Sequence, residues 1–315
     1  MGELSKKIGE KGEEIVATLF KQYFGFPNYR DGLTIECFDS ATHAGLRGNK
    51  SQTHGVDGLV HYKSPLDEEV LEIGYISVKH MKNPYPKYPR SKFKEHFIDL
   101  ATGLECFKLS KYKSDIETKA RNVKKTRIVG VLFWLSNSNE SKDKDIIDEL
   151  SKSQLESLQI QFDEIIVVDN ARLQFIVQTL ETVKAFGDGK FDFVYPSTGL
   201  NLKANHNENI GAILPMEFLA YDILPLRYKI NDAVFFHLAC REGISEESLV
   251  QVMSLSKTFD KVQAARKIVI SFPDYNSQDH EDMVSTVKSY FEDQQFTEQI
   301  KVEGQSIDFR NISDG

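Results

Sequence analysis

The segment HGVDGLVHYKSPLDEEVLEIGYISVKH, residues 54–80, decides the fold of the first part of the chain. It predicts two strands, VDGLVHY and EVLEIGYISVKH, joined by a turn at KSPLDE. Asp57 lies near the beginning of the first strand and Lys79 near the end of the second. A lysine that closes an apolar strand, with a carboxylate on the preceding strand, indicates a site that holds phosphate and metal.

The two-residue period of a strand places Ser77 and Lys79 on one face, together with Ile73 and Tyr75. Asp57 lies on the neighbouring strand, so its side chain and that of Lys79 can project from the same face of the sheet near its end. The sequence therefore predicts one site to which both strands contribute.

Length and composition are those of a globular protein. The chain has 315 residues, of which 40% are apolar and 27% charged, enough for two modest cores. The first residues, MGELSKKIGEKGEE, are charged and unlike a signal peptide, and no apolar stretch approaches the length of a bilayer. The three cysteines are far apart and lack zinc-type spacing. We therefore expect a cytoplasmic protein with free thiols and no membrane association.

Charge is unevenly distributed along the chain. The net charge is −8, which argues against a protein that coats DNA by bulk electrostatics. Residues 79–127 nevertheless contain fourteen Lys or Arg against five Asp or Glu, whereas residues 273–315 contain three against ten. This asymmetry indicates one face for phosphates and another for solvent or a partner. A solvated helix and loop explain the basic run equally well.

Apolar periodicity predicts alternating helices and strands, which favours an α/β fold throughout. The first half is expected to contain helices over 6–26, 91–112, 146–154 and 172–186, and strands over 33–40, 56–62, 69–80, 127–137, 162–170 and 191–196. Loops are expected over 45–55 and over the proline-rich residues 82–90. Strands and helices are expected to alternate in the second half as well, with strands within 223–243, 266–275 and 300–309 and helices over 245–255 and 280–292.

The polar segment 198–212, rich in Asn and Gly, is the expected linker. We therefore predict a first domain over residues 1–200 and a second α/β domain over 201–315, which binds a partner or regulates the first. Two Leu-Pro pairs interrupt the apolar run GAILPMEFLAYDILPLRYK, residues 211–229. This run is expected to be a domain junction or a protein-docking surface.

GEEIVATLF, VDG and SVK, taken in this order, resemble the PD-(D/E)xK nuclease superfamily, particularly its Mrr-like and Holliday-resolvase-like branches. The resemblance covers roughly residues 8–80. It implies a restriction-endonuclease-like mixed sheet flanked by helices. It also implies that a helical Glu, an Asp and a strand Lys converge on a divalent metal, Mg²⁺ or Mn²⁺.

This resemblance assigns the metal ligands to Glu13 and Asp57, and catalytic roles to both of these and to Lys79 and Ser77. Lys79 would orient the attacking water or offset charge on phosphorus. Ser77 takes the position where the family has its second carboxylate, so the site has one anionic ligand fewer than the usual pattern.

Two acidic side chains are candidates to replace that ligand. Helical spacing groups Glu13 with Val16 and Phe20 on the apolar face, and Glu14 with the polar face, so Glu13 is the expected ligand. Glu95, on the helix after the lysine, is the second candidate, since some relatives move the acid to that helix.

Basic residues next to the predicted site are candidates to bind nucleic acid: Lys82, Lys87, Arg90, Lys92 and Lys94. Tyr85 and Tyr88 lie between them and could stack on exposed bases. A solvated proline-rich loop is the alternative explanation.

The nuclease-like first part and the run at 211–229 together look like the nuclease subunit of a two-gene anti-phage defence system of the GAPS type. This resemblance implies a companion protein subunit and cleavage of nucleic acid on infection. We expect a Mg²⁺-dependent nuclease, with DNA the favoured substrate. An RNA-cleaving effector that attacks tRNA is the second hypothesis, and an inactive nuclease fold that binds nucleic-acid ends or a partner protein is the third.

Overall fold

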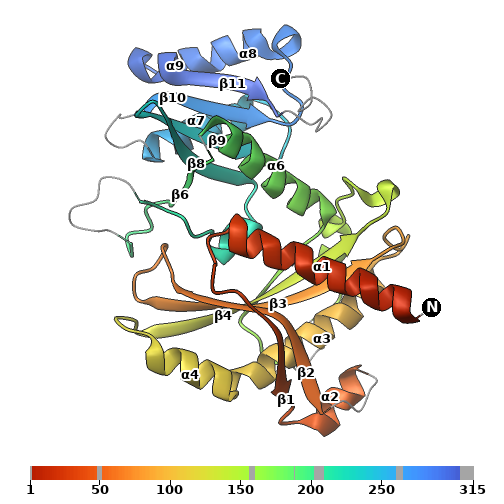
Figure 1. Ribbon diagram of the computed structural model, residues 1–315. Coiled ribbons are helices and arrows are strands. Elements are labelled where there is room, and N and C mark those ends of the chain that lie inside the picture. Colours follow the sequence, from red (N-terminus) through yellow and green to blue (C-terminus); the bar gives the residue numbers. More distant parts are fainter. Residues whose placement is uncertain are drawn as a thin grey trace. The chain divides into compact units, whose positions relative to one another are not determined.

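The computed structural model describes residues 2–47, 52–155, 160–187, 189–201, 209–259 and 265–305, and the chain divides into two compact units (Figure 1). The first unit comprises residues up to 174 together with 215–220, and the second comprises 175–214 and 221–315. The predicted boundary at residue 200 thus falls within the second unit. Strand β6 (Asp192–Val194) explains the difference, because it pairs with β8 (Ile223–Ile230) of that unit.

A five-stranded mixed sheet forms the centre of the first unit, with the strands in sequential order β1 to β5. β1, β2 and β3 are antiparallel neighbours, whereas β3, β4 and β5 run parallel. The bounds are β1 Arg30–Glu36, β2 Thr53–Lys63, β3 Val70–Met81, β4 Lys125–Ser136 and β5 Glu164–Val168. This is the mixed sheet that the family resemblance implies, and the α/β fold class is confirmed.

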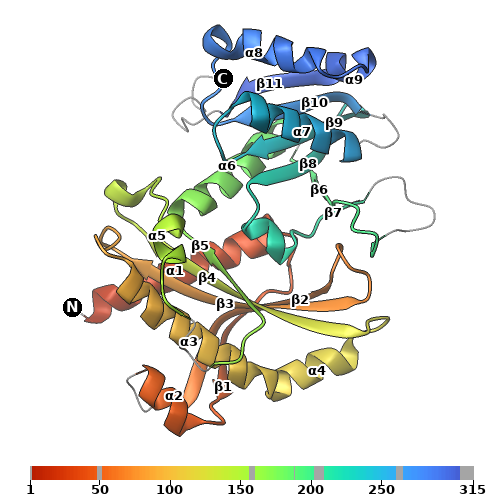
Figure 2. The same ribbon diagram turned by 180° about the vertical axis from the view of Figure 1, so that it is seen from behind.

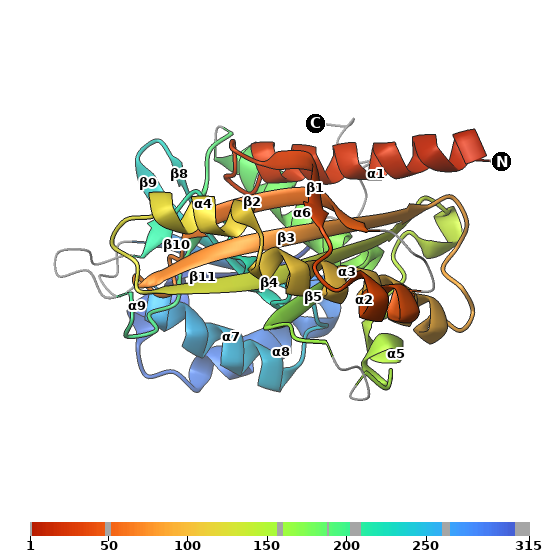
Figure 3. The same cartoon turned by 90° about the horizontal axis from the view of Figure 1, so that it is seen from below.

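Helices cover both faces of this sheet, α1 on one side and α3 on the other (Figure 1; seen from below in Figure 3). The α1 face is aromatic, and the rings of Phe20 on α1 and Phe133 on β4 lie 6.0 Å apart. On the other face, Phe97 and Leu104 of α3 belong to one buried cluster with Tyr75 and Trp134. The helical elements are α1 Gly2–Gln22, α2 Ser40–Arg47, α3 Arg90–Lys108, α4 Lys111–Lys119, η1 Asn139–Ser141 and α5 Ile147–Ser151.

Two local predictions are wrong in the first unit, and one is confirmed. Gly25, the predicted helix stop, has a φ of 80°, a conformation that glycine adopts without steric strain. The single helix expected over 91–112 is instead two, because Ser110 is extended and its hydroxyl caps α4 at the Lys113 N–H. The loop expected over 45–55 begins inside α2.

The second unit contains a six-stranded mixed sheet in the order β11-β10-β9-β8-β6-β7 (Figure 2). Asn231 and Asp232, both at positive φ, form the turn of the β8–β9 hairpin. The remaining elements are β7 Ile210–Gly211, β9 Ala233–Cys240, β10 Ala265–Phe272, β11 Ile300–Gly304, α6 Asn170–Phe186, α7 Glu246–Phe259, α8 Ser277–Ser289 and α9 Gln294–Gln299. Of the predicted linker at 198–212, residues 202–208 lie outside the described residues.

The proline-interrupted run at 211–229 contains a short 3-10 helix, η2 (Met216–Leu219), that belongs to the first unit. The Met216 N–H donates to the Tyr62 hydroxyl at 2.9 Å, and Glu217 forms an ion pair with Arg127. Met216, Phe218 and Leu219 are buried. This helix is therefore part of a core, and the prediction of an exposed docking surface is wrong there; the run connects the two units instead. Among the described helices, none has the length and apolar character needed to cross a membrane.

Candidate active site

Asp57 is fixed against β3 by a backbone hydrogen bond. Antiparallel pairing places Gly58 of β2 opposite Ile76 of β3, so Asp57 lies beside the end of β3. The Val78 N–H donates to Asp57 Oδ2 at 2.6 Å. The carboxylate is therefore held one residue away from Lys79, and the two predicted strand residues come together at one end of the sheet.

Lys79 forms an ion pair with Asp99 of α3, with Nζ 2.8 Å from Oδ2. Its side chain is 27% exposed. Burial lowers the pKa of Lys79, but the carboxylates of Asp99, Asp57 and Glu13 outweigh this effect and raise the pKa above its ordinary value. The ammonium group is therefore charged at neutral pH.

Glu13 approaches the same site because α1 packs closely on β3. A Cβ atom on Gly12 would lie 2.4 Å from the His80 Cβ, so only glycine allows this approach. The His80 Nδ1 also lies 2.8 Å from the Ile8 carbonyl oxygen. Glu13 is partly buried whereas Glu14 is exposed, as the helical spacing predicts. Burial, and then the charge of Asp57, raise the pKa of Glu13.

Folding disfavours the charged form of the Asp57 carboxylate. Burial, and more weakly the charge of Asp99, raise its pKa, while hydrogen bonds from the Val78 N–H and the Ser77 hydroxyl and the charge of Lys79 oppose the shift. Ser77 is buried and acts here as a donor to Asp57. Three carboxylates thus influence one lysine, and such an excess of negative charge favours a bound cation.

Asp99 is the residue that sequence reasoning missed. Glu95, the predicted alternative acid, is 62% exposed and pairs with Lys92 at 2.5 Å. Asp99 lies one helical turn later, on the same side of α3, and contacts Lys79 instead. The spacing of four residues between Glu95 and Asp99 indicates that both acids lie on the same side of the helix. Only the packing of α3 on the sheet shows which of the two contacts Lys79.

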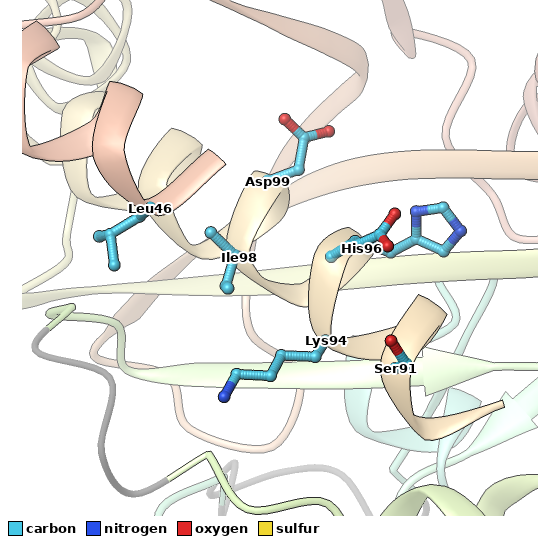
Figure 4. A pocket seen from close by; sticks show the side chains of 7 residues that line it. Leu46, Ser91, Lys94, His96, Ile98 and Asp99 are labelled. Carbon is cyan, nitrogen blue, oxygen red and sulfur yellow. The ribbon is translucent and has the colours of Figure 1, made fainter. Parts of the chain in front are cut away.

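A cavity of about 470 Å³ borders this helix, with Leu46 of α2 on its other side (Figure 4). Asp99 and Lys94 both line it, and in Figure 4 they project from α3 in different directions. His96 is a further lining residue. Burial, followed by the charges of Lys79 and Lys92, lowers the pKa of His96 to about 4, so its imidazole is neutral at pH 7.

The predicted nucleic-acid contacts divide into exposed and paired side chains. Lys82 and Lys87 are exposed, and Lys94 lines the cavity. Arg90 forms an ion pair with Glu149 at 3.1 Å, and Lys92 pairs with Glu95. Whether these five residues contact nucleic acid stays a prediction.

The two tyrosines of this loop differ. Tyr88 is 71% exposed and remains a candidate for stacking on a base. Tyr85 is buried, and its hydroxyl donates to the Trp134 carbonyl oxygen at 2.6 Å. The prediction that Tyr85 stacks on a base is therefore wrong, because its ring belongs to the core.

A second group of potential ligands lies apart from these carboxylates. Cys37, His43, His54 and Cys106 have ligand atoms that are all within 4.8 Å of one another, and within the described ranges no other group of three or more is gathered so closely. Sequence reasoning treated the two cysteines as unrelated thiols, because more than sixty residues separate them.

Comparison with known proteins gives one result. The family described as the GAPS4 protein PD-(D/E)XK nuclease domain matches residues 1–172. This range includes Glu13, Asp57, Lys79 and Asp99, and it ends two residues before the first unit's long segment does. No curated protein and no solved structure matches the chain.

Proposed function

The chain belongs to the family of GAPS4 PD-(D/E)XK nucleases, and on this premise we propose that it cleaves DNA with the help of Mg²⁺ or Mn²⁺ at the site formed by Glu13, Asp57 and Lys79. The family supports a nuclease that serves in anti-phage defence. One observation carries the assignment of the site: Asp57 and Lys79 lie together at one end of the sheet, within electrostatic reach of Glu13 and Asp99.

The side chains present are suited to a hard divalent cation. Mg²⁺ prefers oxygen ligands, keeps several waters and needs only one or two carboxylates from the protein. Glu13 and Asp57 would supply these. Burial raises the pKa of each, the charge of Asp57 adds to the shift of Glu13 and the charge of Asp99 adds to that of Asp57, and a bound cation relieves these effects. When bound, such an ion polarises the scissile phosphate and lowers the pKa of a coordinated water.

Each remaining residue has a separate task in this proposal. The charged Lys79 ammonium donates hydrogen bonds to a phosphate oxygen or to the attacking water, and Asp99 holds it in place at 2.8 Å. The Ser77 hydroxyl and the Val78 N–H donate to Asp57 and so fix the direction of its carboxylate. Ser77 is thus a positioning residue in this site and not a metal ligand.

The proposals about the substrate and the companion subunit are supported by the distribution of charge along the chain. Lys82, Lys87, Arg90, Lys92 and Lys94 would contact phosphates beside the site, with Tyr88 stacking on a base. The net charge of −8 disfavours a grip on DNA by this chain alone, which supports a companion subunit and a partner-binding or regulatory role for residues 201–315.

The test uses the native complex, isolated from cytoplasmic extract through a tag on this chain. Supercoiled plasmid, linear duplex DNA and tRNA are each incubated with Mg²⁺, Mn²⁺, Ca²⁺ or EDTA. We expect cleavage of DNA with Mg²⁺ or Mn²⁺, none with EDTA, and none by the Asp57→Ala complex. The matched control is Lys63→Ala, an exposed change at the other end of β2, which should cleave like the wild type.

Two outcomes contradict parts of the proposal. Cleavage of tRNA without cleavage of DNA would establish the RNA-directed alternative with the same site. Absence of cleavage of all three substrates, or cleavage that persists in Asp57→Ala, would end the assignment of catalysis to this site and favour a nuclease fold that only binds.

A further inference from the structure

Four potential ligands of a different kind converge at the end of β1. Ile35 of β1 pairs with His54 of β2, and Cys37 lies two residues beyond Ile35 on the same face. Helix α2 begins at Ser40 and carries His43 in its first turn, while α3 carries Cys106 near its end. His43, His54 and Cys106 are each at most 3% exposed. The approach of these elements can be followed in Figure 1.

His43 is oriented toward the two sulfur atoms by a carboxylate. Its Nε2 lies 3.0 Å from Glu105 Oε2, and the Gln161 N–H donates to the other oxygen of Glu105 at 3.4 Å. An N–H at Nε2 that donates to Glu105 leaves the Nδ1 lone pair available. This is the arrangement in which a carboxylate fixes the tautomer of a metal-binding histidine.

The distances from Nδ1 match those of a tetrahedral site. His43 Nδ1 lies 3.2 Å from Cys37 Sγ and 3.5 Å from Cys106 Sγ. In tetrahedral zinc sites the metal lies about 2.3 Å from sulfur and about 2.0 Å from nitrogen, so neighbouring ligand atoms are about 3.3–3.8 Å apart. The backbone N–H groups of Phe38 and Asp39 lie within hydrogen-bonding reach of the Cys106 sulfur.

We propose that Cys37, His43, His54 and Cys106 bind one Zn²⁺ ion in a closed structural site. Two thiolates and two imidazoles are a donor set that zinc occupies with no open position, and soft sulfur ligands disfavour Mg²⁺. The site is distinct from that of Glu13 and Asp57, whose oxygen ligands suit a hard cation.

Such an ion would tie together the end of β1, α2, β2 and α3. β2 carries Asp57 three residues after His54, and α3 carries Asp99 seven residues before Cys106. The zinc site would therefore fix the two elements whose carboxylates flank Lys79. Binding of this ion would also stabilise the folded chain, because metal binding and folding are coupled in such sites.

The first experiment measures metal in the full-length chain by mass spectrometry of the elements after purification without added metal. We expect close to one zinc per chain in the wild type and in Cys240→Ser, which changes the third cysteine, in the second unit. The double variant Cys37→Ser/Cys106→Ser should contain none. Asp57→Ala should keep its zinc, which separates this site from the proposed nuclease site.

The second experiment uses the wild type alone, because the double variant could fail to fold. Zinc is removed with a chelator and replaced with Co²⁺, and we expect the intense visible absorption of tetrahedral cobalt together with sulfur-to-metal charge transfer. The chelated protein should have a lower melting temperature that added Zn²⁺ restores. After unfolding in urea, all three cysteines should react as free thiols, since Cys106 and Cys240 are buried in the folded chain.

Three results would overturn the proposal: a wild type that contains no zinc and binds none, a double variant that keeps its zinc, or a cobalt spectrum without sulfur ligands. A Cys37–Cys106 disulfide in the freshly purified chain, seen as a single reactive thiol, would also contradict it. The nuclease assignment survives each of these outcomes, since it depends on other residues.

Discussion

Two charged clusters lie at opposite ends of β3, and they differ in how their carboxylates are paired. The β3-start cluster consists of Glu72, Tyr62, Arg127, Glu164 and Glu217. Glu72 is fully buried and accepts hydrogen bonds from the Tyr62 hydroxyl and the Arg127 guanidinium. The same guanidinium pairs with Glu217, and with Glu164 at 3.9 Å, so one arginine with several donors pairs with all three carboxylates.

The β3-end cluster consists of Glu13, Asp57, Lys79 and Asp99, again with one cation for three carboxylates. Lys79 pairs with Asp99, and the pKa values of Glu13 and Asp57 are raised. Buried charges that are paired and hydrogen-bonded contribute to a stable core, whereas unpaired acids with perturbed pKa values are typical of functional sites. The comparison teaches that the pairing of each carboxylate with the cation, and not the ratio of charges or their burial alone, separates the two ends of this strand.

Replacing the lysine of the β3-end cluster should have the largest effect, and only on activity. We expect Lys79→Met to lower the rate of DNA cleavage by about 1,000-fold, because a charged donor at the phosphate is lost. Unfolding by urea should show a change in stability below about 1 kcal/mol, since Asp99 is half exposed and remains solvated. A variant that cleaves at the wild-type rate would remove Lys79 from the mechanism.

Replacing the cation at the other end of β3 with methionine should lower stability and leave activity unchanged. Arg127→Met leaves Glu72 buried without its cation, and we expect it to lower the free energy of unfolding by about 3 kcal/mol. The rate of cleavage per folded molecule should be unchanged. Lys108→Met, which breaks an exposed ion pair with Asp163, is the control and should lose less than about 1 kcal/mol. Equal losses in the two variants would refute the distinction between the clusters.

A finer test separates two adjacent glutamates on α1. Glu13→Gln should raise the Mg²⁺ concentration needed for half-maximal cleavage by about tenfold, because a proposed ligand loses its charge. Glu14→Gln, next to it but exposed, should leave the metal requirement unchanged. If the two variants show the same Mg²⁺ dependence, Glu13 is not a ligand.

The smallest expected effect is a gain in stability that depends on pH. Because the pKa of Asp57 is raised by folding, the folded state binds its proton more tightly, and stability falls as pH rises through the folded-state pKa. Without divalent metal, Asp57→Asn should therefore be more stable than the wild type at pH 7, by about 1 kcal/mol, and no more stable at a pH below the ordinary range of an aspartate.

The measurement is the urea midpoint in EDTA at both pH values. The exposed Asp115→Asn serves as the control and should show no such gain. A loss of stability in Asp57→Asn at pH 7 would mean that the attraction of Lys79 and the hydrogen bonds outweigh the burial of the carboxylate.

Some features of this chain follow from the sequence by itself. The strand pair at 54–80 is predicted because period-two apolar patterns flank a polar turn, and these are properties of neighbouring residues. The order of helical Glu, strand Asp and strand Lys identifies the nuclease family for the same reason, and Glu13 rather than Glu14 faces the sheet as helical periodicity requires.

Other features are decided by tertiary packing. Asp99 rather than Glu95 meets Lys79 because of the way α3 lies on the sheet, and Tyr85 is part of the core although its sequence surroundings are those of an exposed loop. Cys37 and Cys106 become neighbours only when α3 packs beside the end of β1. The physical reason is common to all three cases: local pattern fixes which face of an element a side chain occupies, but the partner on that face comes from a distant part of the chain.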